Sequence, residues 1–229
     1  MKKNILGVTL ARGGSKGIKN KNLSKINGKP LIYFTLKEAK KSKDLTNYIV
    51  STDSSKIKNV VKKYKVDVPF IRPKKFARDN SSSASALKHA LTECEKFYNK
   101  KFDYVVELMA TNPLKSVIDI NNIIKILIKN NADSVIAVNQ LYDHHPARIK
   151  KIIKGKIYDF SVKEKLESRR QDLKPEAYVR SGSIYAMSRR FVMQEKRYFS
   201  GKSFAYVLPS ERTINIDNKN DLLIAKIKV

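Results

Sequence analysis

Short apolar segments rich in β-branched residues alternate along the chain with longer segments in which apolar residues recur every three or four positions. The short segments predict buried β-strands, and the longer period predicts helices that cover a sheet. Expected strands are Ile5–Leu10, Tyr48–Thr52, Val68–Ile71, Tyr104–Leu108 and Ser134–Val138, and expected helices are Leu31–Lys41, Ser55–Tyr64, Ser83–Tyr98 and Val117–Asn130. This alternation is typical of βαβ units, so we predict an α/β fold with a mainly parallel sheet.

The pattern changes after Asn139, where residues 141–172 are largely polar and basic. Gly155 marks the turn of an expected hairpin, and we predict that residues 141–180 form an excursion from the main domain. The chain then returns to strand and helix patterns. The expected elements here are hairpin strands Ile149–Ile153 and Lys156–Phe160, strands Ser183–Met187 and Phe204–Val207, and a final helix Lys219–Lys228. We therefore expect residues 1–229 to form one domain with one excursion.

Charge is the most prominent feature of the composition, with 48 Lys and Arg against 21 Asp and Glu and a formal net charge of +27. The cations are spread along the chain and never form a block of five, so a solvated basic surface is favoured over a specific nucleic-acid site. No apolar run approaches the roughly 20 residues of a membrane span, and the first residues do not resemble a signal peptide. Cys94 is the only cysteine, which excludes an internal disulfide and favours a reducing cytoplasm.

A loop with three glycines and four cations follows the first expected strand. It reads Leu10-Ala11-Arg12-Gly13-Gly14-Ser15-Lys16-Gly17-Ile18-Lys19-Asn20-Lys21-Asn22. Glycines let backbone N–H groups approach phosphate oxygens, and Arg and Lys neutralise phosphate charge. The loop matches neither the Walker phosphate loop nor the dinucleotide fingerprint. It therefore predicts a nucleotide site of another class.

Residues 11–18, together with Lys21 and Asn22, resemble the signature of the acylneuraminate cytidylyltransferases (CMP-sialic acid synthetases). These enzymes join CTP to the anomeric hydroxyl of a nonulosonic acid and release pyrophosphate. Ordered motif blocks extend the resemblance from Leu6 to about Leu223. The resemblance implies a three-layer αβα nucleotidyltransferase fold of Rossmann-like type, a magnesium ion, and a homodimer in which the excursion at about residues 141–180 is the dimerisation segment.

The resemblance also assigns the nucleotide side of the site. CTP is expected to contact Leu10, Ala11, Arg12, Ser15, Lys16, Lys21, Asn22, Arg72, Ser81 and Ser83. Lys21 is also expected to act in catalysis through the triphosphate. The serines at 81–83 have a second interpretation as the cap of the following helix, and the two roles are compatible. Asp53, in Ser51-Thr52-Asp53, is interpreted as a helix cap rather than as part of the pocket.

The sugar and metal sides depart from the family pattern. Sugar-binding residues are expected at Met109, Thr111, Arg169, Arg170, Gln171 and Tyr178, with Arg170 as a catalytic residue. Met109 stands where the family has a glutamine, and Lys115 replaces an arginine. Asn215 and Asp217 lie two apart, so on a strand both face one side, where Asp217 is expected to bind Mg²⁺ and act in catalysis and Asn215 to be a weaker ligand. The two histidines before Pro146 are interpreted as a structural turn.

Three alternative functions remain open at this stage. The first is activation of an eight-carbon 3-deoxy-manno-octulosonate or a neutral sugar phosphate. The second is a basic nucleic-acid-binding domain without catalysis. The third is an inactive relative that only binds nucleotide, suggested by Met109 and Asn215.

Overall fold

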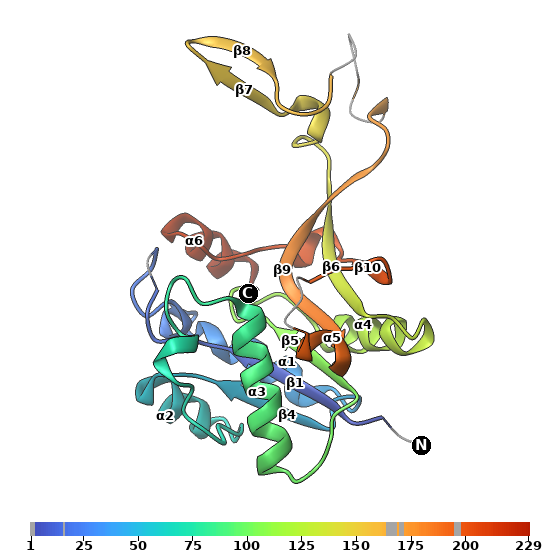
Figure 1. Ribbon diagram of the computed structural model, residues 1–229. Helices are drawn as coiled ribbons and strands as arrows, with labels where there is room; N and C mark the ends of the chain where they lie inside the picture. Colours follow the sequence, from blue (N-terminus) through green and yellow to red (C-terminus); the bar gives the residue numbers. More distant parts are fainter. Residues whose placement is uncertain (1–2, 16, 164–168, 170–171, 195–197) are drawn as a thin grey trace.

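The computed structural model describes residues 3–15, 17–163, 169, 172–194 and 198–229. Its centre is a six-stranded sheet in the order β10–β6–β9–β5–β1–β4 (Figure 1). The strands are β1 (Ile5–Leu10), β4 (Asn47–Ser51), β5 (Tyr104–Leu108), β6 (Ser134–Leu141), β9 (Ala177–Ser188) and β10 (Ser203–Val207). Only β9 runs against its neighbours, pairing antiparallel with β5 and β6, so the prediction of a mainly parallel sheet is confirmed.

Helices cover both faces of this sheet. On one face α3 (Ser83–Phe97) and α5 (Arg189–Met193) pack against apolar side chains of β1, β5 and β9. On the other face lie α1 (Leu31–Lys41), α2 (Ser55–Lys63) and α4 (Val117–Lys129). The arrangement is the predicted three-layer αβα fold. Within the described part of the chain, no helix combines the length and apolar character that a bilayer span requires.

The C-terminal segment packs beside the glycine loop. Helix α6 (Lys219–Lys228) contributes Ala225 to a small core with Ile26, Leu31 and Ile216. Short elements complete this region and the connections. They are β2 (Lys25–Ile26), β3 (Lys29–Pro30) and the 3-10 helices η1 (Lys21–Leu23), η2 (Lys74–Phe76), η3 (Pro146–Arg148) and η5 (Ser210–Arg212).

The long strands β6 and β9 carry the chain away from the sheet to a separate hairpin, β7 (Lys150–Ile153) and β8 (Lys156–Asp159) (Figure 1). Lys154 and Gly155 form its two-residue turn, with φ of 47° and 76°, as a type I′ hairpin requires. At the base of the excursion the buried His145 side chain accepts a hydrogen bond from the Ala147 N–H at 3.2 Å and donates one to the Pro175 carbonyl at 2.9 Å. These bonds give His145 the structural turn role expected for the histidine pair.

One predicted strand is wrong. Val68–Ile71 forms no strand, and this region meets the edge of the sheet only through isolated bridges, Ile49 with Asp67 and Thr52 with Ile71. Pro69 supplies the physical reason, because it has no N–H to donate to a ladder. Strands β6 and β9 also extend beyond their predicted limits, and α5 was not anticipated.

Candidate active site

The glycine loop leaves β1 at the carboxyl end of the parallel strands and is held by its own neighbours. The Ala11 N–H donates to the Ser51 carbonyl at 3.0 Å, and the Ala11 side chain is fully buried. The amide of Asn22, also buried, donates to the Arg12 carbonyl at 3.1 Å. Asn22, expected at the nucleoside, is therefore placed where it fixes the loop backbone.

Asp53 also holds this loop, and its predicted capping role is wrong. Its carboxylate accepts a hydrogen bond from the Gly13 N–H at 2.8 Å. The cap of α2 is Ser54, whose hydroxyl accepts from the Ile57 N–H at 3.4 Å. Because α2 begins at Ser55, Asp53 lies one residue too early to cap it and is available to the glycine loop.

A cavity of about 310 Å³ opens beside this loop, between the ends of β1 and β5 and the start of α3. It brings together many of the residues predicted to bind CTP, and Met109 with them. The predicted residues that line it are Leu10, Arg12, Arg72, Ser81, Ser83 and Met109. Arg12 forms an ion pair with Asp79 at 2.6 Å, which ties the glycine loop to the loop before α3. Phe76 and Ala86 add apolar surface to the wall.

The three serines before α3 have separate roles. Ser82 is the helix cap and accepts from the Ser85 N–H at 3.1 Å. The Ser81 hydroxyl donates to the Lys75 carbonyl at 2.7 Å and thereby shapes the loop that carries Asp79. Ser83 lies at the helix start and lines the cavity. Capping thus uses one serine and leaves Ser83 facing the cavity.

Two buried charges line the same cavity. Arg72 is 3% exposed and Glu107 is fully buried, and burial lowers the pKa of the arginine and raises the pKa of the glutamate to about 7. The Tyr198 hydroxyl and the Arg72 guanidinium pull the pKa of Glu107 the other way. Neither carboxylate oxygen of Glu107 has a described partner within hydrogen-bond geometry, so the Tyr198 hydroxyl is a nearby group that lowers the pKa without a well-formed bond. Sequence reasoning missed Glu107, although a carboxylate inside the apolar run of β5 is a visible signal.

The far end of the glycine loop meets the segment before α6. The Lys21 ammonium donates to the Ile216 carbonyl at 2.8 Å and to the Asp217 carboxylate at 2.9 Å. The Asn215 amide donates to the other oxygen of Asp217. A Cβ at Gly17 would lie 2.5 Å from the Asp217 carbonyl oxygen, so only glycine fits there. The fold thus brings Lys21 together with Asn215 and Asp217, although Lys21 and Asp217 are 196 positions apart in the sequence.

Thr111 and Lys115 link this segment to the end of β5. The Ile216 N–H donates to the Thr111 carbonyl at 2.9 Å, while the Thr111 hydroxyl is buried without a partner among the described residues. The buried Lys115 ammonium donates to the Thr35 hydroxyl at 2.9 Å, to the Met109 carbonyl at 2.7 Å and to the Asn112 carbonyl. Burial lowers the pKa of Lys115 to about 7. Lys115 therefore holds the loop after β5 through hydrogen bonds to its backbone carbonyls, and its ammonium does not face the cavity.

The donor set around Asp217 decides how a metal ion would be held. No group of three or more acidic, histidine or cysteine side chains that could hold a metal ion occurs among the described residues. Asp217 offers one carboxylate, 65% exposed, with the Asn215 side chain beside it. Asp221 serves instead as the partner of Asn218 in the capping box of α6. Magnesium commonly takes one or two carboxylates and completes its shell with water and phosphate oxygens, so this donor set fits it.

The remaining predicted residues do not gather at the cavity. Ser15 lies half-buried in the glycine loop, and Lys16, Arg170 and Gln171 lie outside the described residues. Arg169 forms an ion pair with Asp172 at 2.9 Å, and the Tyr178 hydroxyl donates to Glu176 at 2.7 Å. Both Arg169 and Tyr178 belong to the excursion, and neither lines the cavity beside the glycine loop.

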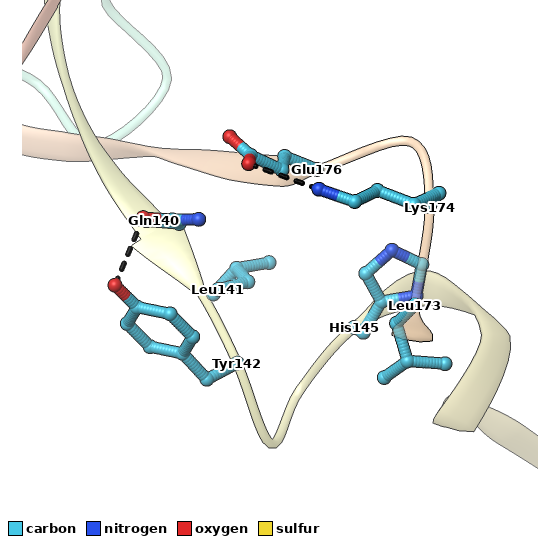
Figure 2. Close-up of a pocket in the computed structure, with 7 residues that line it drawn as sticks. All are labelled: Gln140, Leu141, Tyr142, His145, Leu173, Lys174 and Glu176. Carbon is cyan, nitrogen blue, oxygen red and sulfur yellow. Dashed lines mark hydrogen bonds and ion pairs between the residues drawn. The ribbon is translucent and has the colours of Figure 1, made fainter. Parts of the chain in front are cut away.

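A second cavity, of about 300 Å³, lies within the excursion. In Figure 2, Lys174 points to Glu176 and Tyr142 to Gln140, while His145 and Leu173 lie near Lys174, on the side away from Tyr142 and Gln140. Its lining residues are Gln140, Leu141, Tyr142, His145, Leu173, Lys174 and Glu176. Tyr178, expected to bind sugar, bonds to one of these residues, which places it at the edge of this second cavity.

Comparison with known proteins finds similarity to cytidylyltransferases and CMP-sugar synthetases. The cytidylyltransferase family matches residues 6–207. Pseudaminic acid cytidylyltransferase of Campylobacter jejuni is 32% identical over 219 residues, covering 95% of this chain and 92% of the relative. CMP-N,N'-diacetyllegionaminic acid synthase of the same species is 28% identical over 230 residues, covering 98% and 94%. A solved CMP:2-keto-3-deoxy-manno-octonic acid synthetase, in complex with CTP, is 14% identical, covers 98% of each chain and has a TM-score of 0.70, which shows a shared fold.

Proposed function

The chain belongs to the cytidylyltransferase family, and from that premise we propose that it transfers CMP from CTP to the anomeric hydroxyl of a nonulosonic acid and releases pyrophosphate. The observation that carries the proposal is the course of the glycine loop. At one end the loop borders the cavity with Arg72, and at the other it contacts the Lys21–Asp217 pair. The cavity suits the base and ribose of a nucleotide, the Lys21–Asp217 end suits its phosphates and their counter-ion, and the glycine loop connects the two.

The proposed arrangement puts the base and ribose in the cavity, near Arg72 and Ser83, and the triphosphate along the loop. Arg12 and Lys21, with Lys16 of the same loop, supply positive charge to the phosphates. The oxygen of the sugar's anomeric hydroxyl attacks the α-phosphorus of CTP and forms an O–P bond, while the hydroxyl proton passes to solvent. The bond from the α-phosphorus to the oxygen that bridges to the β-phosphate breaks, and pyrophosphate leaves. Position and charge neutralisation carry most of the catalysis in such transfers.

We assign the magnesium site of this reaction to Asp217, with the Asn215 amide oxygen as a weaker ligand. When bound, the ion would neutralise charge on the phosphate oxygens. Lys21 has a complementary task in the proposal, because its side chain, 18% exposed beside Asp217, can transfer its ammonium from the carboxylate to a phosphate.

A nonulosonic acid is favoured over the eight-carbon acid as the sugar. The relatives that carry the names of pseudaminic and legionaminic acids are 32% and 28% identical to the chain, whereas the octonic acid synthetase shares the fold at 14% identity. Met109, at the cavity, replaces the glutamine of the family pattern, so we expect the sugar to be held differently at this point. Arg169, Arg170, Gln171 and Tyr178 remain the proposed sugar contacts.

We propose that those contacts come from the excursion of a second copy in a homodimer. The hairpin and the residue that follows it expose large apolar side chains, which a partner surface would cover. Ile152 is 76% exposed, Ile157 is 71% exposed and Phe160 is 60% exposed. Replacing Ile157 with Asp should shift the protein toward monomer in light-scattering measurements after size exclusion, and an unchanged mass would contradict this interface. A cytoplasmic location completes the proposal, supported by the single, buried and unpaired Cys94.

The direct test is pyrophosphate release from CTP and Mg²⁺ with a panel of nonulosonic acids and the eight-carbon acid. We expect turnover with at least one nonulosonic acid, and Lys21→Ala should raise the KM for CTP by about tenfold or more, as loss of a charge-assisted contact predicts. Lys56→Ala, an exposed lysine of α2, is the matched control and should behave as the parent. Turnover only with the eight-carbon acid, or tight salt-dependent nucleic-acid binding without CTP chemistry, would refute the proposal.

A further inference from the structure

We propose that Glu107 selects cytosine in this cavity, its carboxylate accepting a hydrogen bond from the exocyclic amino group of the base. The inference rests on the proposed CTP-dependent function and adds the residue that distinguishes CTP from UTP. Glu107 lines the cavity and is the fourth residue of β5, at the end of the strand where the predicted CTP contacts converge.

The first reason is that Glu107 is buried without a partner. Side chains alternate along β5, so Glu107 lies on the same side as Val105 and Met109, which pack toward α3. A buried carboxylate that has lost its water and gained no donor is costly to the fold. Since both of its oxygens lack partners among the described residues, a ligand that brings a donor into the cavity would satisfy this group.

The second reason is the position of Arg72. Its Nε is also buried without a partner, and it lines the same cavity. The two side chains are near enough for the arginine to lower the pKa of Glu107, yet no ion pair joins them. A ligand edge that accepts at one atom and donates at the next would therefore satisfy both groups at once.

Cytosine has such an edge and uracil does not. Cytosine presents two acceptors, O2 and N3, followed by the N4 amino donor, and carboxylates accept from that amino group in nucleic-acid recognition. Uracil presents an N3–H donor where Arg72 also offers donors, and an O4 acceptor where the ionised Glu107 carboxylate offers only acceptors. Bound uracil would thus place a donor against Arg72 and an acceptor against Glu107, and neither buried group would gain a hydrogen bond.

The charged and titratable groups that interact with Glu107 are Arg72, Tyr185 of β9 and Tyr198 of the segment after α5. Burial raises the pKa of Glu107 to about 7. A bound amino donor favours the ionised carboxylate, so cytosine binding would stabilise the form that recognises it.

The test measures nucleotide binding by calorimetry without sugar, so it is independent of turnover. The probes are CTP, UTP and the triphosphate of pyrimidin-2-one riboside, which is CTP without its 4-amino group. A base contact of this kind is worth about fivefold to 150-fold in affinity. The intact protein should bind CTP more tightly than both other nucleotides by a factor in that range.

Two variants then assign the effect to Glu107. In Glu107→Gln the amide can rotate to donate to O4, so the CTP-to-UTP ratio should fall toward one. In Glu107→Leu the loss of the amino group should no longer weaken binding. Glu95→Gln is the control, because Glu95 is also buried but is paired with Arg189 and lies outside the cavity, and it should keep the parent ratio.

The outcomes separate the two proposals. Equal binding of CTP and its desamino analogue by the intact protein would overturn the role of Glu107, and so would a parent CTP-to-UTP ratio in Glu107→Gln. The first of these results needs no variant, so misfolding of Glu107→Leu cannot obscure it. Absence of any nucleotide binding by the intact protein would instead overturn the proposed function itself.

Discussion

Replacing Asp53 with alanine should loosen the glycine loop and weaken CTP binding. The Asp53 carboxylate holds the Gly13 N–H at 2.8 Å and is the side-chain anchor at this point of the loop. A hydrogen bond to a charged group contributes about 1.5–3 kcal/mol, and the lower end applies because Asp53 is half-buried. If the free loop must be reordered at each binding event, about 1.5 kcal/mol corresponds to a roughly tenfold rise in the Kd for CTP.

The matched variant is Asp53→Asn, which can keep an oxygen acceptor for Gly13 while losing the charge. We expect Asp53→Asn to bind CTP more tightly than Asp53→Ala by most of that tenfold factor. Calorimetric titration of CTP into each variant measures the difference, with thermal unfolding as the check on folding. The reasoning is refuted if Asp53→Ala binds CTP as tightly as the parent, or if both variants are weakened equally, which would assign the effect to charge.

Three further predictions concern the loop, the strand end and the metal side. Gly17→Ala should weaken CTP binding by about tenfold or more, because the added Cβ would lie 2.5 Å from the Asp217 carbonyl oxygen. The control Gly201→Ala, which has no neighbour within 4 Å, should bind CTP as the parent does, and equal binding by both variants would contradict this packing. Burial lowers the pKa of Lys115 to about 7, so between about pH 7 and 10 the folded state binds fewer protons than the unfolded state. As pH rises through that window, urea titrations should show the free energy of unfolding of the parent increasing relative to that of Lys115→Met, and a constant difference would argue against a buried titrating ammonium. Asn215→Asp should lower the Mg²⁺ concentration needed for half-maximal activity, and an unchanged magnesium titration would place Asn215 away from the ion.

Much of the fold could be predicted from local pattern alone. The limits of β5, a fully buried strand, follow from an apolar run that only Glu107 interrupts, and α4 follows from its regular isoleucine spacing. Val68–Ile71 failed because its apolar side chains satisfy the strand pattern while Pro69 removes a ladder donor. Apolar periodicity reports which side chains are buried and says little about where backbone hydrogen bonds go.

The site divides in a similar way. Residues that follow parallel strands could be grouped in advance, because strand ends of one direction meet at one edge. The partner of each side chain depends on the folded backbone. Asp53 turned out to hold Gly13, forty positions away, and Glu107 became part of the site only when β5 and α3 enclosed it. Lys21 and Asp217 are separated by 196 positions, and only the packing of α6 beside the loop joins them.

The Lys21–Asp217 ion pair also bears on the order in which ligands arrive. Each side chain neutralises the charge of the other. An anion that binds Lys21 therefore leaves the Asp217 carboxylate without a partner, and a cation that binds Asp217 leaves the Lys21 ammonium without one. A ligand that carries both charges exchanges the two partners in a single event. If the proposed function holds, we therefore expect this pair to bind nucleotide together with its counter-ion more readily than either ion alone.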